Sequence, residues 1–466
     1  MTKRKDPPKN DDSDMSDSDT EMNHNMKNLL TTIFQFHDSS LNNVIVRPKR
    51  NVKKKEETQK SYELLRKYIE LTTNLHSGKD IQYFNKTLTL KHKRIIVDKL
   101  EAIHSMDYSS KPKIIQLIES DIPLHFKSIG LKKIIQLQNG IDNSGKLEQW
   151  IDSFLKIPFK NSCQLPVTME DGPIQCKEFI DYCEKTLNEC TYGMHHAKNQ
   201  LLQIIGKWLV NPSSMGTAIA LKGPMGTGKT TLIKHGISKI LNRPFAFITL
   251  GGNSDGCYLT GHSYTYEGST YGKIVDILIQ SKCNNPVIFF DELDKVSQTE
   301  KGEEIVGVLT HLTDTTQNSQ FHDKYFSEID FDLSKCLFIF SYNEEHKVNP
   351  ILKDRMYTID IHGYNKKEKT MIALDYLLPE IKNEYDGKLS NLEFSEEIID
   401  YIIEKIEKEE GVRNLKRALE TICNKINLRR FYEPNLFDNS YLLSTKDIDT
   451  MLIKKNKEKS YTNMYL

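Results

Sequence analysis

A glycine-rich segment between an apolar stretch and an amphipathic stretch has the residue types of a phosphate-binding loop. The segment GPMGTGKT fits the pattern G-x-x-x-x-G-K-[ST], follows the apolar stretch AIAL and precedes TTLIKHGISKIL. Three glycines allow the backbone to curl so that its N–H groups face phosphate oxygens, and the start of the next helix adds partial positive charge. Lys229 can reach β- and γ-phosphates, and the Thr230 hydroxyl can bind Mg²⁺. The pattern predicts a nucleotide-phosphate site made by Gly223, Pro224, Met225, Gly226, Thr227, Gly228, Lys229, Thr230 and Thr231.

Two adjacent acids follow the apolar stretch VIFF. They are Asp291 and Glu292, in the segment VIFFDELDK. We expect neighbouring strand ends to bring both carboxylates to the phosphate site, where Asp291 can hold Mg²⁺ and Glu292 can orient and activate the attacking water. An acidic strand end alone is weak support for such a site. Together with the phosphate-binding loop upstream, it predicts a site for ATP hydrolysis.

Three further polar residues occur downstream in an order that suits this chemistry. Asn343 ends the apolar stretch CLFIFSYN and could hold the same water, Arg355 lies in ILKDRM, and Arg413 lies in GVRNL. Two arginines suit a transition state whose negative charge is spread over phosphoryl oxygens. The alternative for each arginine is a surface ion pair, and their order and context favour the catalytic interpretation.

Composition argues against a membrane-spanning or secreted protein and does not favour a particular charged partner. The chain has 466 residues with 64 Lys+Arg and 64 Asp+Glu, so net charge gives no argument for nucleic acid or a membrane as partner. No apolar run reaches the ~20 residues of a membrane helix, and the N-terminus has no secretory signal. We therefore expect an intracellular, cytoplasmic protein, with the nucleus as the alternative; the acidic N-terminal block argues against a mitochondrial transit peptide.

The eight cysteines include no CxxC pair and are expected to be free thiols. Cys176, Cys183 and Cys190 recur at seven-residue intervals. This spacing separates the thiols by two helical turns, so it favours a buried helix face over a metal site.

Changes in composition and hydrophobic periodicity divide the chain into five segments. Residues 1–60 are polar and charged and predict a disordered tail, which includes a basic run at 47–55. Residues 61–190 have helical periodicity, and 191–365 alternate short apolar runs with helical patterns. Residues 366–455 predict three helices, the second capped by Ser395, and 456–466 form a C-terminal tail. The strands are expected to stop after about residue 365.

The predicted fold class is α/β. The apolar runs TAIALKG, PFAFITLGG, NPVIFFDE, KCLFIFSYN and MYTIDI predict a parallel sheet with helices on both faces, because strands that alternate with helices form such sheets. A C-terminal helical lid and an N-terminal helical region complete the prediction. The irregular segment TGHSYTYEGS between the phosphate-binding loop and the two acids carries two tyrosines, and an exposed tyrosine in a loop often contacts a partner.

These motifs together resemble an AAA+ ATPase, and within that superfamily the ATPase part of Lon proteases. The resemblance covers about residues 190–455 and is carried by YGMHHAKNQLLQII, GPMGTGKT, LGGNSDGCYLTGHSYTYEGS, VIFFDELDK, QNSQFHDKYFSEIDFDLSKCLFIFSYN, LKDRM and GVRNL. The long glycine- and tyrosine-containing motif is distinctive for Lon, whereas the phosphate-binding loop and acidic motif fit any AAA+ protein. The segment WIDSFLKIPF is similar to the Lon element just before the ATPase domain.

The resemblance implies roles for individual residues. Lys229, Thr230, Asp291 and Glu292 would bind and hydrolyse Mg-ATP, Asn343 would be sensor 1, Arg413 sensor 2, and Arg355 the finger that reaches a neighbouring subunit's nucleotide. Tyr192 and Gly193 would lie in the loop beside adenine. An arginine that acts in trans implies a homo-oligomeric ring, and the rings of the family are hexamers.

The same resemblance interprets the tyrosine-containing segment as a pore loop. Tyr266 would be the aromatic residue that grips an unfolded polypeptide. Glu267 stands where the family has an aliphatic residue, and Tyr271 where proline is expected, so the substrate would be basic or specialised, or translocation weak. No membrane partner is expected.

The sequence predicts a protein-remodelling ATPase without its own peptidase. The chain ends just past the lid, with no Ser-Lys dyad or metal-peptidase signature, and no docking motif indicates a separate peptidase subunit. A nucleic-acid-associated AAA+ machine is the main alternative, supported only by the basic run at 47–55. A scaffold that binds nucleotide without turnover is a third reading, which the complete set of catalytic residues disfavours.

Overall fold

The computed structural model describes residues 50–72, 78–107, 111–140, 144–212, 218–252, 255–386, 389, 391–432 and 441–452. The chain forms two compact units, of which the first ends at Lys111 and the second begins at Pro112. A disordered tail is predicted at 1–60. Residues 1–49 of it lie outside the described residues, and residues 50–60 are helical instead. The tail predicted at 456–466 also lies outside them.

The first unit is a small helical structure. Its described helices are α2 (Arg50–Leu71), α3 (Gly78–Thr87) and α4 (Leu90–Asp107). Leu65, Phe84 and Val97 form its core, and the Tyr68 ring stacks on Phe84 with centroids 4.1 Å apart. The part of the predicted basic run from residue 50 to residue 55 belongs to α2.

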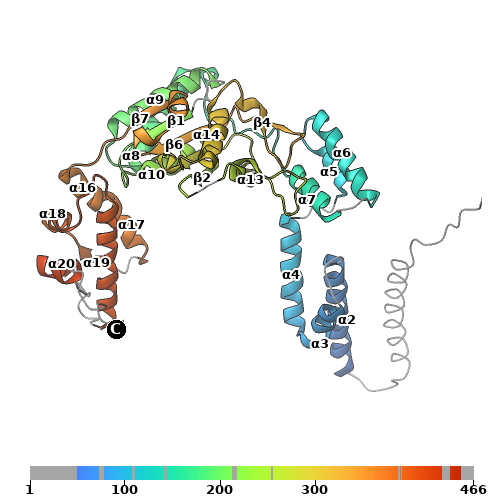
Figure 1. Ribbon diagram of the computed structural model, residues 1–466. Coiled ribbons are helices and arrows are strands. Elements are labelled where there is room, and N and C mark those ends of the chain that lie inside the picture. The colour runs from blue at the N-terminus through green and yellow to red at the C-terminus, as the bar shows by residue number, and fades with distance from the viewer. Residues whose placement is uncertain are drawn as a thin grey trace, which may run out of the picture. The chain divides into compact units, whose positions relative to one another are not determined.

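The second unit is built on a parallel sheet of five strands. The strands are β1 (Ala218–Lys222), β2 (Phe245–Thr249), β3 (Val287–Asp291), β6 (Leu337–Tyr342) and β7 (Met356–Asp360). Their order in the sheet is β2-β3-β6-β1-β7, and each pair is parallel. All five apolar runs therefore form strands, and the predicted α/β fold with a parallel sheet is confirmed (Figure 1).

Alternate residues of the central strands belong to two separate cores, one on each face of the sheet. On β3, for example, Ile288 and Phe290 pack into one core while Val287 and Phe289 pack into the other. The same alternation on β1 and β6 explains why these strands are mostly apolar instead of alternating with polar residues. Both faces of the sheet are consequently covered by helices.

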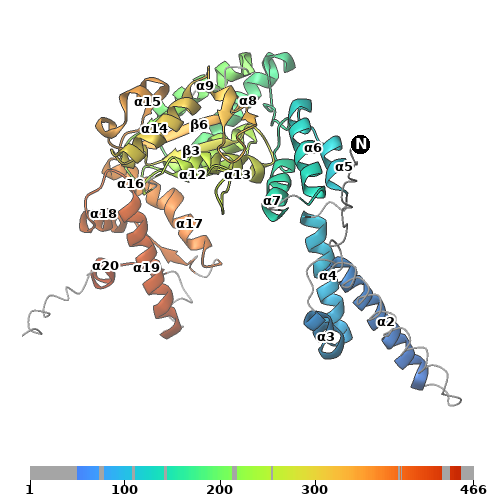
Figure 2. The same ribbon diagram turned by 45° about the vertical axis from the view of Figure 1, so that its right-hand side comes forward.

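The helices on the two faces come from different parts of the chain. In Figure 2, α8 and α9 lie on one side of the strands and α12 and α13 on the other. The first core receives α5 (Lys113–Glu119), α6 (Leu124–Gln138), α7 (Ser144–Leu155), α12 (Cys257–Thr260), α13 (Lys273–Ser281) and α14 (Glu300–Thr313). The second core receives α8 (Pro173–Cys190), α9 (His195–Val210) and a helix made of α10 (Lys229–Thr231), a π-helical turn (Leu232–Ile237) and α11 (Ser238–Leu241).

The three regularly spaced cysteines share one helix, as predicted. Cys176, Cys183 and Cys190 all lie on α8 and pack against the second core, with Cys183 completely buried. Burial raises the pKa of the Cys183 thiol to about 12, which keeps it protonated at neutral pH. Within the described ranges no cluster of His, Cys, Asp and Glu side chains could hold a metal ion.

The C-terminal part of the second unit is a helical subdomain with its own core, here called the lid. It contains α16 (Lys366–Ile372), which continues through a π-helical turn (Ala373–Leu377) into α17 (Leu378–Asn383), and then α18 (Glu396–Lys405), α19 (Arg413–Tyr432) and α20 (Thr445–Leu452). The Ser395 side chain caps α18 by accepting a hydrogen bond from the Ile398 N–H at 3.3 Å. The expectation that strands end near residue 365 is wrong, because β8 (Leu392–Glu393) and β9 (Tyr441–Leu442) form a short parallel pair.

The second unit also contains shorter elements. Among them are α15 (Pro350–Asp354) and the antiparallel pair β4 (Phe321–His322) and β5 (Asp330–Phe331). None of the helices that the structure describes is both long and apolar enough to cross a membrane.

Candidate nucleotide-binding site

The glycine-rich loop connects β1 to α10 at the carboxyl edge of the sheet. Gly226 and Gly228 have φ angles of 75° and 92°, a region that glycine adopts without steric cost. The helix then starts at Lys229, so its free N–H groups and partial positive charge face the cavity that the loop borders. Main-chain donors at a helix start are the elements that bind a phosphate group.

Glycine is required at position 223 for close packing and not for the predicted curling of the loop. Its φ is not positive, and its N–H donates to the Tyr342 carbonyl at 3.1 Å, as a continuation of the sheet. A Cβ atom at this position would overlap the backbone of Ile361, which follows β7. Gly223 therefore allows close packing against the neighbouring chain segment and does not curl the loop.

Lys229 is buried beneath the loop that precedes it. Its Nζ donates to the carbonyl oxygens of Gly223 at 2.6 Å and Pro224 at 3.0 Å, and to Asn343 Oδ1 at 2.8 Å. Burial lowers the pKa of this ammonium to about 8, although Asp291 and Asp294 oppose the shift. These three acceptors orient Lys229 at the floor of the loop.

The two acids occupy the carboxyl end of β3, but β3 is not a neighbour of β1. The prediction of neighbouring strand ends is wrong in this respect, because β6 lies between the two strands. Asp291 Oδ1 accepts hydrogen bonds from the Ser341 hydroxyl, on β6, and from the Glu292 N–H. Asp291 and Glu292 nonetheless line the same cavity as the glycine-rich loop, since parallel strands all end at one edge of the sheet.

Glu292 is held in a left-handed backbone conformation, with φ at 61° and ψ at 45°. A non-glycine residue in this region is uncommon and is often found at functional sites. Its carboxylate lies against Gly251, just beyond β2, where a Cβ atom would overlap Glu292 Oε2. The side chain therefore depends on a glycine in the adjacent strand connection.

The lid contacts the glycine-rich loop directly. The Val412 N–H donates to the Gly226 carbonyl at 3.1 Å, and a Cβ atom on Gly226 would lie 3.0 Å from Arg413 Cβ. A Cβ atom on Gly411 would overlap the Met225 carbonyl oxygen. Two backbones that approach this closely place Arg413, the first residue of α19, in the wall of the cavity.

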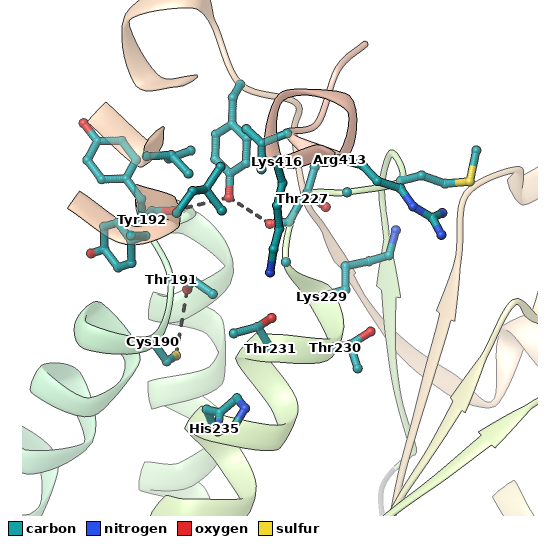
Figure 3. Close-up of a pocket in the computed structure, with 18 of the residues that line it drawn as sticks. Cys190, Thr191, Tyr192, Thr227, Lys229, Thr230, Thr231, His235, Arg413 and Lys416 are labelled. Atoms are coloured by element: carbon teal, nitrogen blue, oxygen red, sulfur yellow. Dashed lines mark hydrogen bonds between the residues drawn. The ribbon is translucent and has the colours of Figure 1, made fainter. Parts of the chain in front are cut away.

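A cavity of about 670 Å³ lies between these elements (Figure 3). Its walls include the predicted residues Tyr192, Met225, Gly226, Thr227, Gly228, Lys229, Thr230, Thr231, Asp291, Glu292, Asn343 and Arg413. The predicted residues that do not line it are Gly193, Gly223, Pro224 and Arg355. The volume is within the usual range for sites that bind small molecules and cofactors.

Three tyrosines line the cavity, and Figure 3 shows one of them, Tyr192, on the side away from Lys229. Tyr364 donates its hydroxyl to the Thr227 carbonyl at 2.8 Å and so ties the start of the lid to the glycine-rich loop. Tyr192 and Tyr376 contact edge to face, with ring centroids 6.3 Å apart. This apolar, aromatic side suits a planar base, whereas the Lys229 side suits phosphate.

Sequence reasoning missed several residues of the cavity. The lid supplies Tyr364, Tyr376, Glu380 and Lys416, and α8 ends in the cavity with Cys190. No local pattern marks these residues, since Tyr376, Glu380 and Lys416 belong to ordinary amphipathic helices and Tyr364 lies just before α16. Ser341, which does not line the cavity but contacts Asp291, could have been suspected, because a hydroxyl inside an otherwise apolar strand needs a hydrogen-bond partner.

The oxygen donors at the carboxyl edge fit Mg²⁺. Asp291 Oδ2 makes no hydrogen bond to any described residue, and the Thr230 hydroxyl lines the same cavity. Mg²⁺ in nucleotide sites is usually held by one or two carboxylate or hydroxyl oxygens together with phosphate oxygens and waters. A carboxylate and a hydroxyl are therefore a sufficient protein contribution.

Arg355 lies outside the cavity, at the end of α15. Its guanidinium forms an ion pair with Asp314, the residue that follows α14. The Thr316 hydroxyl donates to the same carboxylate at 2.6 Å. Hydrogen bonds from Thr316 and Arg355 hold the pKa of Asp314 well below its usual range. The side chain is thus oriented within its own subunit but does not contact the nucleotide cavity of that subunit.

The predicted pore loop projects a tyrosine into solvent. Tyr266 is 68% exposed, and Glu267 beside it is also exposed. The root of the loop is narrow, because the His262 N–H donates to the Thr270 carbonyl at 3.1 Å and Gly261 packs against Gly272. Lys146, on α7, donates to the Tyr266 carbonyl at 2.8 Å.

Tyr271, found where proline is expected by resemblance, has a structural role. Its ring contacts Tyr325 and Phe326, with centroid distances of 6.1 and 5.9 Å, in a cluster that includes Trp150 of α7. The buried Asp323 carboxylate fixes the same region by accepting hydrogen bonds from the Gly272 N–H at 2.7 Å and the Tyr325 N–H at 2.8 Å. The aromatic substitution therefore attaches the loop root to α7.

Comparison with protein families agrees with the geometry. Residues 219–362 match the ATPase family associated with various cellular activities (AAA), and residues 385–434 match the Lon protease AAA+ ATPase lid domain.

Related proteins are named Lon protease. A Lon protease homolog of Acanthamoeba polyphaga mimivirus is 35% identical over 404 residues, which are 83% of this chain and 39% of the relative. The Lon protease of Clostridioides difficile is 35% identical over 66% of this chain and 40% of the relative, and that of Fusobacterium nucleatum is 30% identical over 69% and 41%. The chain thus spans about two fifths of the length of these relatives. It carries a Lon-like AAA+ ATPase module, with its AAA domain at residues 219–362 and its Lon-type lid at residues 385–434.

Proposed function

We propose that this protein is an ATP-hydrolysing ring motor that unfolds or remodels protein substrates. The observation that carries the proposal is the combination of a lid-covered nucleotide cavity with an exposed tyrosine loop in one unit. Glu292 lies against Gly251, at the start of the connection that leads from β2 towards Tyr266. A change at the nucleotide would therefore reach the loop through a short segment of chain.

The proposed mechanism assigns a task to each part of the cavity. Main-chain N–H groups of the glycine-rich loop and Lys229 would hold the β- and γ-phosphates, while Thr230 and Asp291 would hold Mg²⁺, which neutralises phosphate charge when bound. Glu292 would accept a proton from the attacking water, with Asn343 orienting that water. Asn343 accepts from Lys229 here, so it would have to exchange this partner when phosphate binds.

The lid and a neighbouring subunit would supply the two arginines. Arg413 lines the cavity of its own subunit, whereas Arg355 does not. This placement supports a role for Arg355 at the nucleotide of a neighbouring subunit, in a homo-oligomeric ring that we propose to be a hexamer. We propose no peptidase activity for the cavity, because its walls suit phosphate and, among the described residues that line it, no nucleophile is hydrogen-bonded to a base.

The close lid contact at Gly411 can be tested by adding a methyl group. In Gly411→Ala the added methyl group would overlap the Met225 carbonyl and push the lid away from the loop. Overpacking of this kind usually costs ~1–3 kcal/mol, so we expect nucleotide affinity to fall about tenfold. Gly307→Ala is the matched control, since a Cβ atom there meets no other atom within 4 Å. Calorimetric titration with ADP measures both variants, and equal affinities would contradict a tight lid contact.

The protein-remodelling activity can be tested through Tyr266. ATP turnover of the purified protein should increase with an unfolded polypeptide, and Tyr266→Ala should reduce this stimulation about tenfold, the factor that corresponds to ~1.4 kcal/mol of lost aromatic contact. Tyr357→Ala is the control, because Tyr357 is a 43% exposed tyrosine on the edge strand β7. Stimulation by single-stranded DNA instead of polypeptide would favour a nucleic-acid motor.

A further inference from the structure

Lys416 is a cation in the nucleotide cavity that has no assigned task. It lies on α19 three residues after Arg413, so both side chains emerge from the same face of the helix. Figure 3 shows the Lys416 side chain directed from the lid into the cavity, between the Tyr192 side and the Lys229 side and above Thr231. The lid thus offers two positive charges to the cavity.

An acid of the lid holds this ammonium in the structure. Lys416 Nζ lies 3.0 Å from Glu380 Oε1, and Glu380 also lines the cavity. The Lys416 and Glu380 side chains are 34% and 58% exposed, and ion pairs with such exposure contribute little to stability. A polyanionic ligand that enters the cavity could therefore displace Glu380 at small cost.

We propose that Lys416 binds the α-phosphate of the nucleotide and that Glu380 competes with the nucleotide for this lysine. The inference rests on the proposed binding of ATP. A nucleotide with its base at the Tyr192 side and its terminal phosphates at Lys229 has its α-phosphate between them, where Lys416 reaches. In the proposed mechanism Lys229 binds the terminal phosphates, and Arg413 lies on the Lys229 side of the cavity (Figure 3), so Lys416 would supply the positive charge that is otherwise missing along the chain of phosphates.

The α-phosphate is present in AMP, ADP and ATP, whereas AMP lacks the β-phosphate, so comparison of the three ligands makes the proposal specific. Lys416→Met should weaken binding of AMP, ADP and a non-hydrolysable ATP analogue by the same factor, about tenfold for the loss of one charge-assisted hydrogen bond. Glu380→Gln should tighten all three ligands severalfold, because it removes the competitor. In the Lys416→Met background, Glu380→Gln should have no further effect.

Calorimetric titration of the unmodified protein, the two single variants and the double variant tests these expectations. Lys416→Arg should retain affinity, and Lys366→Met is the control for loss of a paired lid lysine outside the cavity. Unchanged ADP affinity in Lys416→Met would overturn the proposal, as would tightening by Glu380→Gln that persists without Lys416. Weakening of the ATP analogue alone would place the ammonium at the γ-phosphate, and weakening of ADP and the ATP analogue without AMP would place it at the β-phosphate; either result would contradict the α-phosphate assignment. Failure of the unmodified protein to bind ADP or the ATP analogue would remove the proposed function itself.

Discussion

Glu292→Gln is expected to lower ATP turnover by at least about 100-fold, the lower end of the contribution of a positioned general base. The amide keeps the size of the side chain but cannot accept the proton of the attacking water. Because Glu292 is not one of the proposed phosphate ligands, ATP should remain bound and the ring should be stabilised. Steady-state phosphate release measures the first effect, and retention of ATP during gel filtration measures the second.

A second glutamate provides the control for this substitution. Glu303 is exposed on α14, outside the cavity, and Glu303→Gln should leave turnover unchanged. Turnover of Glu292→Gln close to that of the unmodified protein would show that another group activates water. Loss of ATP binding in the same variant would instead indicate that Glu292 supports the cavity structurally, through its contact with Gly251.

Arg355→Ala is expected to reduce turnover on the order of 10³-fold, the lower end of the effect of an arginine finger. The structural reason is that Arg355 does not line its own nucleotide cavity and is oriented by Asp314 at the surface. Mixing Arg355→Ala subunits with Lys229→Ala subunits should restore part of the activity. In a mixed ring, an intact Arg355 from one variant can reach an intact cavity of the other.

The mixing experiment separates a role in trans from a role within the subunit. Absence of rescue at every mixing ratio, with rings still formed, would argue that Arg355 acts in its own subunit. The ion pair with Asp314 makes loss of folding a competing explanation, so thermal unfolding of Arg355→Ala should be measured alongside. Asp314→Asn is informative here, because it removes the partner charge and retains the arginine.

The strands and most cavity residues could be predicted because both depend on local patterns. Apolar runs bounded by glycine and polar residues produced all five strands, and parallel strands bring their carboxyl ends to one edge. Strand order could not be predicted, since the insertion of β6 between β1 and β3 depends on contacts between distant segments. Gly223 shows the same limit, because the neighbour that requires a glycine there, Ile361, is remote in sequence.

The lid was predictable as helices but not as a wall of the cavity. Lys416 and Tyr364 look like ordinary residues of amphipathic segments until the lid is placed on the glycine-rich loop. The short pairing of β8 with β9 was missed for a related reason: each strand has only two residues, too few to produce a recognisable pattern. Tyr271 was noticed as a departure, but its partners, Tyr325 and Phe326, come from a distant segment.

The hydrogen bond between Lys146 and the Tyr266 carbonyl has a mechanical consequence. In the proposed motor, pulling on a polypeptide would put an opposing tension on Tyr266, the proposed gripping residue. Lys146 holds the backbone of Tyr266 and leaves its ring exposed, so this tension would be transmitted to α7 and to the aromatic cluster around Trp150. The load would thus be borne by a packed helix as well as by the narrow loop root.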